Sequence, residues 1–267
     1  MKIFMIAPEP FFEPRGTPLS VLFRIKALNK LGHKIDLLTY PVGKDVDVRG
    51  LKIIRVPNLL FIKKVKIGPS LLKIPLDLML LLKAAIILRK SEYDCIHVHE
   101  EASVIGILLK KIFKLPLIYD MHSSMPEQLV NYNFSKNSVL INLFNWIEKK
   151  VTSESNVIIV VCRNLEKKVR AITNNKKILL IENTQTLENY TNNNEIEKLR
   201  EELGIHNEKV VLYAGTFEYN QGLEVLIKSI PLIVREINNV KFVLVGGEKW
   251  QIKELKKEIE ALKAKEG

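Results

Sequence analysis

The chain has 267 residues, which is long for one domain and short for two, so we expect one complete domain and part of another. Hydrophobic residues make up 47% and charged residues 27%, a mixture typical of a folded protein rather than a disordered one. The net charge of +11 comes mostly from lysines scattered along predicted helices, without an RRM, KH, zinc-finger or helix-turn-helix signature. Nucleic acid is therefore not expected as a partner, and phosphate-bearing ligands or an anionic membrane are left to explain the charge.

Two features of the sequence predict a cytoplasmic protein. Cys95 and Cys162 lie far apart and lack metal-ligand spacing, so we expect two buried thiols in a reducing compartment. The first apolar run is broken by the Pro-Glu-Pro segment at 8–10 and lacks a cleavage site of small residues, which argues against a signal peptide.

Strand-like and helix-like patterns alternate along the chain. In chain order, the patterns predict strand 2–7, helix 17–31, strands 34–40 and 51–56, helix 71–90, strand 95–98, helix 102–113, strand 115–119, helix 138–153, strand 156–161, helix 165–172, strand 177–181, helix 196–203, strand 209–214, helix 221–236, strand 240–245 and helix 249–265. This alternation predicts an α/β fold with a mostly parallel sheet covered on both faces. Such sheets bind ligands at the carboxyl ends of their strands, so functional residues are expected directly after each strand.

A polar segment rich in Asn and Thr divides the pattern in two. We predict an N-terminal Rossmann-like domain at 1–182, a linker at 183–195 and a second Rossmann-like domain at 196–267. The second domain has two predicted strands, too few for a stable open sheet, so we expect it to be incomplete.

The loop after the first strand ends in Arg15-Gly16-Thr17 at the start of a predicted helix. Gly16 would let a bound phosphate approach backbone N–H groups, and Arg15 would add a positive charge. The alternative is an ordinary helix start, with Thr17 and the proline after it serving as N-terminal residues. A dinucleotide-binding G-x-G-x-x-G pattern is missing.

The strand at 95–98 leads into His99 and Glu100. His97 and His99 would share one face of the strand, but a metal site would need a third ligand that the sequence does not identify. We therefore interpret His97 as a buried histidine, and His99 and Glu100 as candidates for a ligand site at the end of the strand.

The next strand is followed by His122, whose neutral imidazole could hydrogen-bond a sugar hydroxyl or a phosphate oxygen. The alternative is a loop histidine that has no functional role. We interpret Asp120 as a residue that caps a turn further along the chain rather than as a general base.

A second pair of strand ends carries glycines. Gly215 and Gly222 bracket a polar loop between strand and helix, where a nucleotide diphosphate could bind, and the strand at 240–245 is followed by two more glycines.

These segments together resemble glycosyltransferase family 4, the retaining nucleotide-sugar transferases with the GT-B fold of two Rossmann-like lobes. The resemblance spans the whole chain and rests on the PRGTP loop, DCIHVHEE, LIYDMHSS, NVIIVVC, ILLIENT, VVLYAGTFEYNQGLEVLIKSI and KFVLVGG. It implies a first lobe that binds a glycan or lipid-linked acceptor and a second lobe that binds a nucleotide-diphosphate sugar. Synthesis of cell-wall or surface polysaccharide is the common setting of this family.

The resemblance also implies roles for single residues. His122 would lie near the transferred sugar as the catalytic residue, and Gly16 and Thr17 would contact the donor diphosphate. Four residues of the second lobe would contact the same diphosphate: Gly215, Thr216, Gln221 and Gly222. Three residues would lie on the acceptor side: Arg15, His99 and Glu100. The family needs no metal ion or other cofactor, because cations and helix N-termini neutralise the leaving phosphate.

The chain departs from the family pattern at two places. Family members usually carry an arginine and a lysine where this chain has Thr216 and Gln221, and neutral hydrogen-bond donors are weaker partners for a diphosphate. The family's Glu-x7-Glu segment should also still lie ahead at residue 267, so we expect a truncated second lobe.

Lysines mixed with bulky apolar residues at 59–66, followed by the apolar helix at 71–90, suit docking to an anionic bilayer. The alternative is a buried helix preceded by a basic loop. Charged residues within 71–90 argue against a membrane-spanning helix.

The leading hypothesis is thus a retaining glycosyltransferase. A second is a non-catalytic module that binds the acceptor, and a third is a sugar-nucleotide epimerase with the same two-lobed fold. A dehydrogenase is the least favoured, because the dinucleotide fingerprint is missing.

Overall fold

The computed structural model describes residues 1–13, 16–59, 61–173, 177–183 and 192–266, with side chains up to residue 261. The chain divides into two compact units, Met1–Gln185 and Thr186–Gly267.

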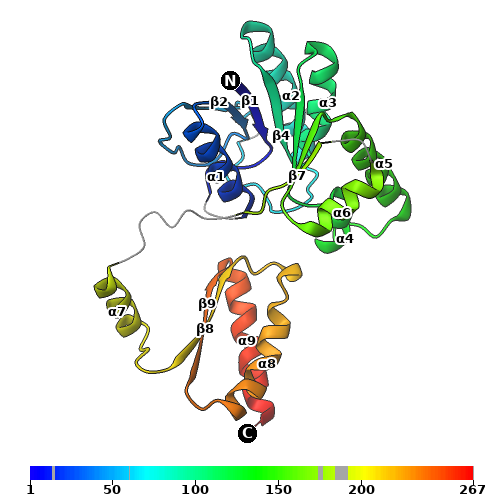
Figure 1. Ribbon diagram of the computed structural model, residues 1–267. Coiled ribbons are helices and arrows are strands. Elements are labelled where there is room, and N and C mark those ends of the chain that lie inside the picture. The colour runs from blue at the N-terminus through cyan, green and yellow to red at the C-terminus, as the bar shows by residue number, and fades with distance from the viewer. Residues whose placement is uncertain (14–15, 60, 174–176, 184–191, 267) are drawn as a thin grey trace. The chain divides into compact units, whose positions relative to one another are not determined.

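The first unit alternates strands and helices, as the sequence predicts (Figure 1). In chain order its elements are β1 (Lys2–Ala7), α1 (Gly16–Lys30), β2 (Lys34–Thr39), β3 (Leu51–Arg55), α2 (Lys73–Lys90), β4 (Cys95–His99), α3 (Ala102–Phe113), β5 (Leu117–Met121), α4 (Met125–Asn131), α5 (Ser138–Glu154), β6 (Val157–Val160), α6 (Arg163–Ile172) and β7 (Lys177–Leu180).

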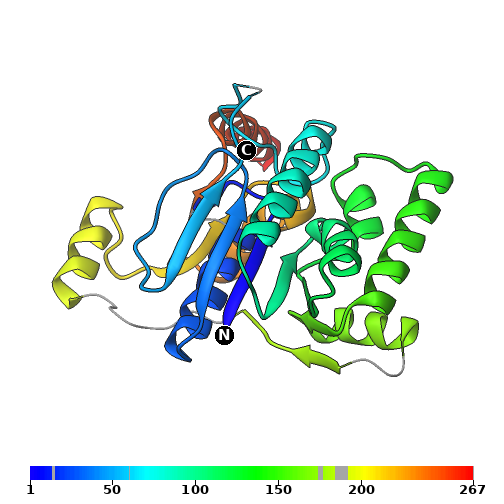
Figure 2. The same cartoon turned by 90° about the horizontal axis from the view of Figure 1, so that it is seen from above.

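The strands form one parallel sheet in the order β3-β2-β1-β4-β5-β6-β7 (Figure 2). The strand order reverses between β1 and β4, because the chain first moves outward through β2 and β3 and then returns to the other side of β1. An open parallel sheet binds its ligands at such a reversal, beyond the carboxyl ends of the strands.

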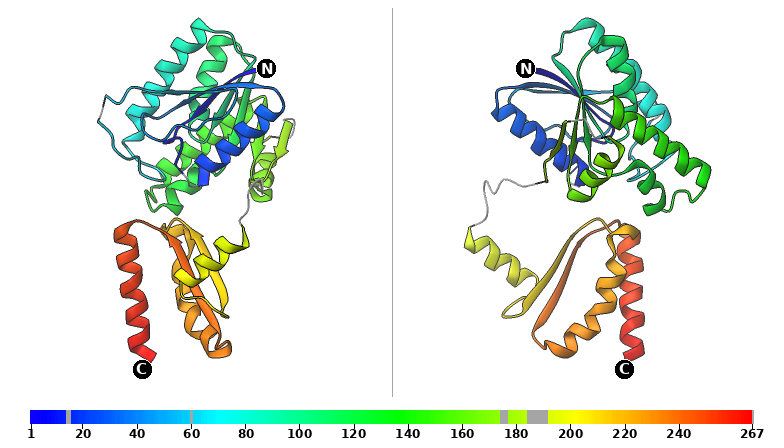
Figure 3. Two further views of the ribbon diagram at one scale, coloured as in Figure 1. Left: turned by 90° about the vertical axis from the view of Figure 1, so that its left-hand side faces the viewer. Right: turned by 45° about the vertical axis from the view of Figure 1, so that its right-hand side comes forward.

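Helices cover the two faces of the sheet. Because connections between parallel strands are right-handed, the direction of each connection along the sheet determines the face on which its helix lies. The crossover from β1 to β2 through α1 runs in one direction along the sheet, and the crossovers from β3 to β4 through α2 and from β4 to β5 through α3 run in the other. Helix α1 therefore lies on one face, and α2 and α3 lie on the other (Figure 3). The core on the α1 face includes Met5, Ile25 and Leu37. The core on the other face is larger and includes Leu80 of α2 and Leu109 of α3. The buried strands therefore carry apolar side chains on both faces.

The structure corrects three details of the sequence interpretation. Strand β5 runs from Leu117 to Met121, so Asp120 lies within the strand and not in a turn. Helix α4 was not predicted; it is 7 residues long, which is too short to show a helical period. Cys162 is exposed, although Cys95 is buried, because Cys162 lies just before α6 at the end of the sheet.

The second unit contains α7 (Asn193–Glu202), β8 (Lys209–Gly215), the 3-10 turn η1 (Tyr219–Gln221), α8 (Leu223–Glu236), β9 (Val240–Gly246) and α9 (Lys249–Glu266). Its described strands β8 and β9 pair in parallel, and α8 makes the crossover between them (Figure 3). Gly246 has a φ of 132°, and a Cβ there would lie 1.8 Å from the carbonyl oxygen of Gly215. The two strand ends can approach this closely only because residue 246 is glycine.

Over the part of the chain that the structure describes, every helix is too short or too polar to cross a membrane.

Helix α2 offers a direct test of the core, because its two faces differ in burial. Leu80 is fully buried and Leu82 is 58% exposed. We expect Leu80→Ala to lower the free energy of unfolding by about 2–5 kcal/mol and Leu82→Ala to change it by less than about 1 kcal/mol. Urea unfolding followed by Trp146 fluorescence in a Trp250→Phe background would measure both in the first unit. Equal losses would contradict the assignment of Leu80 to the core.

Candidate functional site

A cluster of polar side chains lies at the carboxyl ends of β4 and β5, where the strand order reverses. The pairing of His99 with Asp120 and of His97 with Ile118 places these side chains on the face of the sheet that α1 covers. His122 follows directly after β5. The sequence predicted functional residues after these strands, but the cluster begins within the strands themselves.

Arg24 of α1 supplies the charge that Asp120 needs. Its Nε donates a hydrogen bond of 2.9 Å to Oδ2 of Asp120, and its Nη2 donates one of 3.4 Å to Oδ1. The Asp120 side chain has no exposed surface and that of Arg24 is 12% exposed, so water screens the pair weakly. A buried carboxylate without such a partner would be strongly destabilising. The sequence interpretation of Asp120 as a turn cap is therefore wrong.

Three histidines surround the same carboxylate. His97 Nε2 lies 3.2 Å from Asp120 Oδ2, and His122 Nε2 lies 3.4 Å from Oδ1. His99 Nδ1 lies 3.1 Å from His122 Nε2, and the His97 and His99 rings stack with centroids 4.8 Å apart. The expectation that His97 is a buried, hydrogen-bonded histidine is confirmed, since it is 2% exposed.

Burial and neighbouring charges set the protonation states in the cluster. Burial alone would raise the pKa of Asp120, but the hydrogen bond with His97 and the nearby imidazoles hold it well below its usual range. Burial lowers the pKa values of His99 and His122; Asp120 opposes this shift and Arg24 adds to it. At neutral pH we therefore expect a charged Asp120 and neutral imidazoles at His99 and His122, with Arg24 as the balancing cation.

Glu100 lies at the turn after β4, where its φ of 48° is in the left-handed region. Its carboxyl accepts hydrogen bonds from the Ser123 hydroxyl at 3.0 and 3.1 Å and from Gln128 at 3.3 Å. Burial, together with the charge of Glu101, raises its pKa to about 8. Near neutral pH this carboxyl can therefore hold a proton and donate or accept it.

Further polar pairs border the turn that carries Glu100. Lys73 at the start of α2 pairs with Glu101 at 2.6 Å. The Tyr40 hydroxyl donates a 2.6 Å hydrogen bond to Asp77, whose pKa burial raises to about 7. These contacts join α2 to the carboxyl end of the sheet.

A buried glutamate explains why α4 forms where it does. Glu148 of α5 is 1% exposed, and it accepts a 2.8 Å hydrogen bond from the Met125 backbone N–H and one from the Ser124 hydroxyl. Its charge is balanced by Lys168 of α6 at 3.2 Å. The carboxylate therefore satisfies the first turn of α4 from a distant helix, which no local pattern in the sequence could indicate.

The loop at the start of α1 is only partly described. Gly16 is the first residue of α1, it is exposed, and a Cβ there would meet no atom within 4 Å. Thr17 is half-buried. Arg15 lies outside the described residues.

In the second unit, the glycine-bracketed loop follows β8. Gly222 has a φ of 72° and precedes α8, whereas Gln221 ends the 3-10 turn, so the helix begins two residues later than predicted. Thr216 accepts a 2.7 Å hydrogen bond from the Tyr213 hydroxyl through its backbone carbonyl. Gln221 is exposed.

Gln251 of α9 holds this loop in place. Its amide donates hydrogen bonds to the backbone oxygen of Phe217 at 3.1 Å and to Oε1 of Glu218 at 3.3 Å. Its side-chain oxygen accepts a 2.8 Å hydrogen bond from the Glu248 backbone N–H. The sequence did not single out Gln251, because a glutamine in a charged helix resembles its solvated neighbours.

Among the described side chains, one group has possible metal-ligand atoms that all lie within 4.8 Å of one another. It consists of His97, His99 and Asp120. The guanidinium of Arg24 already bonds both oxygens of Asp120. A divalent cation in this group would therefore lie next to a fixed positive charge, and it would compete with Arg24 for the same carboxylate.

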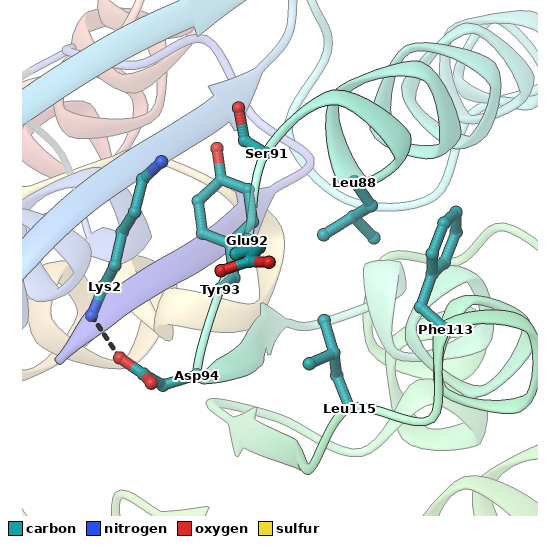
Figure 4. A pocket seen from close by; sticks show the side chains of 8 residues that line it. All are labelled: Lys2, Leu88, Ser91, Glu92, Tyr93, Asp94, Phe113 and Leu115. Atoms are coloured by element: carbon teal, nitrogen blue, oxygen red, sulfur yellow. Dashed lines mark hydrogen bonds between the residues drawn. The ribbon is translucent and has the colours of Figure 1, made fainter.

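A pocket of about 540 Å³ lies at the opposite, amino edge of the sheet (Figure 4). Its lining includes Lys2 at the start of β1, Asp94 just before β4 and Leu115 just before β5. The Lys2 backbone N–H donates a 2.6 Å hydrogen bond to Asp94, so two of the lining residues are joined. Because parallel sheets bind ligands at the other edge, we do not assign the candidate site to this pocket.

The Arg24–Asp120 pair can be tested by removing one partner at a time. We expect Arg24→Met to lower the free energy of unfolding by about 3–5 kcal/mol, because Asp120 would stay buried without its cation. The double variant with Asp120→Asn should lose less than the sum of the single losses, by at least about 1 kcal/mol. Urea unfolding would measure all three. Arg170→Met is the control, because Arg170 is 56% exposed and its pair with Glu166 should contribute less than about 1 kcal/mol. Equal losses at Arg24 and Arg170 would refute the role of the buried pair.

Glu100 should make stability depend on pH. Between the ordinary pKa of 4.5 and about 8, the folded state keeps a proton that the unfolded state releases. This contribution to stability is therefore full at low pH and is lost as the pH rises through that window. The variant Glu100→Gln keeps an oxygen for Ser123 but cannot titrate. As the pH rises from about 5 to about 8, we therefore expect the free energy of unfolding of the wild type to fall by about 2–4 kcal/mol more than that of Glu100→Gln. A difference that does not change with pH would show that Glu100 titrates normally.

Models of two protein families match the chain. The model of Glycosyltransferase Family 4 matches residues 16–184, and that of Glycosyl transferases group 1 matches residues 195–267. An uncharacterized glycosyltransferase of Methanocaldococcus jannaschii is 26% identical over 259 residues, covering 92% of this chain and 63% of that protein. Alpha-monoglucosyldiacylglycerol synthase of Acholeplasma laidlawii is 22% identical over 246 residues, covering 86% of this chain and 59% of that enzyme.

The chain thus spans about three fifths of the length of the curated relatives it matches. Sucrose-phosphate synthase from Thermosynechococcus elongatus has a similar structure, with a TM-score of 0.67 and 18% identity over 91% of this chain and 70% of that one. The fold is of the GT-B type, as predicted. The first family model covers more than half of the chain, and the chain belongs to glycosyltransferase family 4.

Proposed function

We propose that this chain is part of an enzyme that transfers a sugar from a nucleotide-diphosphate donor to a glycan or lipid-linked acceptor, with retention at the anomeric carbon. The observation that carries the proposal is the neutral His122 at the end of β5, held beside Asp120 and the Arg24 cation, in a chain of family 4. The similarity to alpha-monoglucosyldiacylglycerol synthase supports the lipid-linked alternative for the acceptor.

In the proposed step, an acceptor hydroxyl oxygen bonds to the anomeric carbon as the bond from that carbon to the diphosphate oxygen breaks. The hydroxyl proton passes to the departing phosphate on the same face of the sugar, which gives retention. His122 would hydrogen-bond a hydroxyl of the transferred sugar, and its low pKa keeps the imidazole neutral for this role.

The donor diphosphate would be bound by backbone N–H groups at helix starts. In the first unit these would come from Gly16 and Thr17 at the start of α1, where the helix dipole favours negative charge. In the second unit we assign the contact to the loop of Gly215, Thr216, Gln221 and Gly222. The left-handed Gly222 turns the backbone into α8.

The acceptor side is assigned to Arg15, His99 and Glu100. Glu100 is 7% exposed and its carboxyl is oriented by Ser123 and Gln128. His99 has no exposed surface, so we propose that it acts through its contact with His122 rather than by touching the acceptor.

We further propose that the transfer needs no metal ion or other cofactor. Asp120 is the carboxylate best placed to hold a cation, and Arg24 already neutralises it. We also propose a cytoplasmic enzyme of polysaccharide or glycolipid synthesis. Contact with an anionic membrane would not involve the polar cluster, because it would be made by the outer face of α2.

A second candidate is a module that binds the acceptor but does not turn over. Thr216 and Gln221 favour it, because both are neutral where a diphosphate would be better bound by cations.

Titration of the chain with uridine and guanosine diphosphates distinguishes the two functions. We expect weak binding of one of them, unchanged by EDTA, and at least about tenfold tighter binding by the variant Thr216→Arg/Gln221→Lys because the added charges would contact the diphosphate. Calorimetry at two salt concentrations would measure both. The control is Val225→Lys/Leu232→Lys, which adds the same charge on exposed positions of α8 outside the loop. No binding by either chain, or equal gains in variant and control, would overturn the proposed donor site.

A further inference from the structure

The outer face of α2 carries a stripe of exposed apolar side chains. Ile74, Leu78, Leu82 and Ile86 follow one another at intervals of four residues, and each is between 48% and 64% exposed. Residues four apart lie on one side of a helix, so these side chains form a continuous row. The opposite side of the same helix is buried in the core, through residues such as Leu80. Helix α2 is thus apolar on two sides, and the core accounts for only one of them.

Helix α3 extends the stripe. It packs beside α2 on the same face of the sheet, so the outer sides of both helices point away from the sheet together (Figure 1). Val104, Leu108 and Ile112 are again four residues apart, and they are 39%, 46% and 61% exposed. Single exposed apolar residues are common on proteins, but aligned rows on neighbouring helices indicate an interaction surface.

The charges around this surface are almost all positive. Residues 59–90 contain seven lysines and arginines and one acidic residue, Asp77, which accepts a hydrogen bond from Tyr40. Residues 102–114 contain three lysines and no acidic residue. Two of the lysines in these ranges pair with acidic residues outside them, Lys73 with Glu101 and Lys111 with Glu154. The loop before α2 adds exposed Lys63 and Lys66 beside Phe61, which is 89% exposed. The surface is therefore apolar in the middle and cationic at its border.

We propose that the outer face of α2 and α3, with the basic loop at 61–66, docks on an anionic lipid surface. Apolar rows would enter the boundary between head groups and acyl chains, while lysines contact the anionic head groups. A second copy of the chain is a poorer partner, because a two-fold contact would place the same cationic border against itself. No described helix could cross a membrane, so the helices would lie along the surface. This inference does not depend on the proposed transfer reaction.

Sedimentation with vesicles tests the proposal. We expect the chain to bind vesicles of equal parts phosphatidylcholine and phosphatidylglycerol, to bind pure phosphatidylcholine at least about tenfold more weakly, and to lose binding as salt is added. The variant Leu78→Ser/Leu82→Ser/Leu108→Ser should partition at least about tenfold less into the anionic vesicles. Its matched control is Leu199→Ser/Val225→Ser/Leu232→Ser, which changes three apolar residues of the second unit that are at least 55% exposed and should bind like the wild type.

A second pair of variants tests the charges. Lys63→Gln/Lys64→Gln/Lys66→Gln should weaken binding and its salt dependence, whereas Lys253→Gln/Lys256→Gln/Lys257→Gln, with the same net charge but changes on α9, should not. Circular dichroism would confirm that each variant is folded. The proposal fails if the wild type ignores anionic vesicles, or if controls and test variants lose binding equally. It also fails if light scattering shows a dimer that the serine variant at α2 and α3 dissolves while vesicle binding is unchanged.

Discussion

The buried pair of Arg24 and Asp120 is the interaction on which the candidate site depends. Asp120 lies near the carboxyl end of β5 without exposed surface, where a lone carboxylate would be very costly. Arg24 comes from α1, 96 residues earlier in the chain, and bonds both carboxylate oxygens. The pair therefore fixes α1 against β5, and it brings the predicted phosphate-binding end of α1 into the same part of the fold as the histidines.

Two titratable groups near this pair have pKa values shifted in opposite directions. His122 is next to a charged carboxylate and yet has a lowered pKa, because it is buried and the guanidinium is close. Glu100, which is buried and lies next to Glu101, has a raised pKa. A neutral imidazole and a protonated carboxyl thus follow adjacent strands. Both can act as uncharged hydrogen-bond partners for sugar hydroxyls, which are themselves uncharged.

The sequence predicted the elements well, because apolar periodicity and glycine positions are local signals. It predicted β1 and α3 with the bounds that the structure has. It could not predict that Arg24 meets Asp120, since nothing in either segment specifies a partner so far along the chain. Helix α4 was missed because its first turn is satisfied by Glu148 from α5 rather than by a neighbouring residue. Membrane docking was one of two interpretations of residues 59–90, but the sequence did not identify the exposed rows of α2 and α3. A helix that is apolar all round shows no one-sided pattern, and only packing decides which side is exposed.

The two surfaces lie on opposite faces of one sheet. The polar cluster lies on the face that α1 covers, and the apolar rows belong to helices on the other face. Between them lies a close-packed core, so changes in exposed side chains of α2 and α3 should leave the cluster undisturbed. This separation makes each surface interpretable on its own. It also means that a membrane contact would leave the carboxyl edge of the sheet open, because the outer sides of α2 and α3 point away from the sheet rather than beyond the ends of its strands.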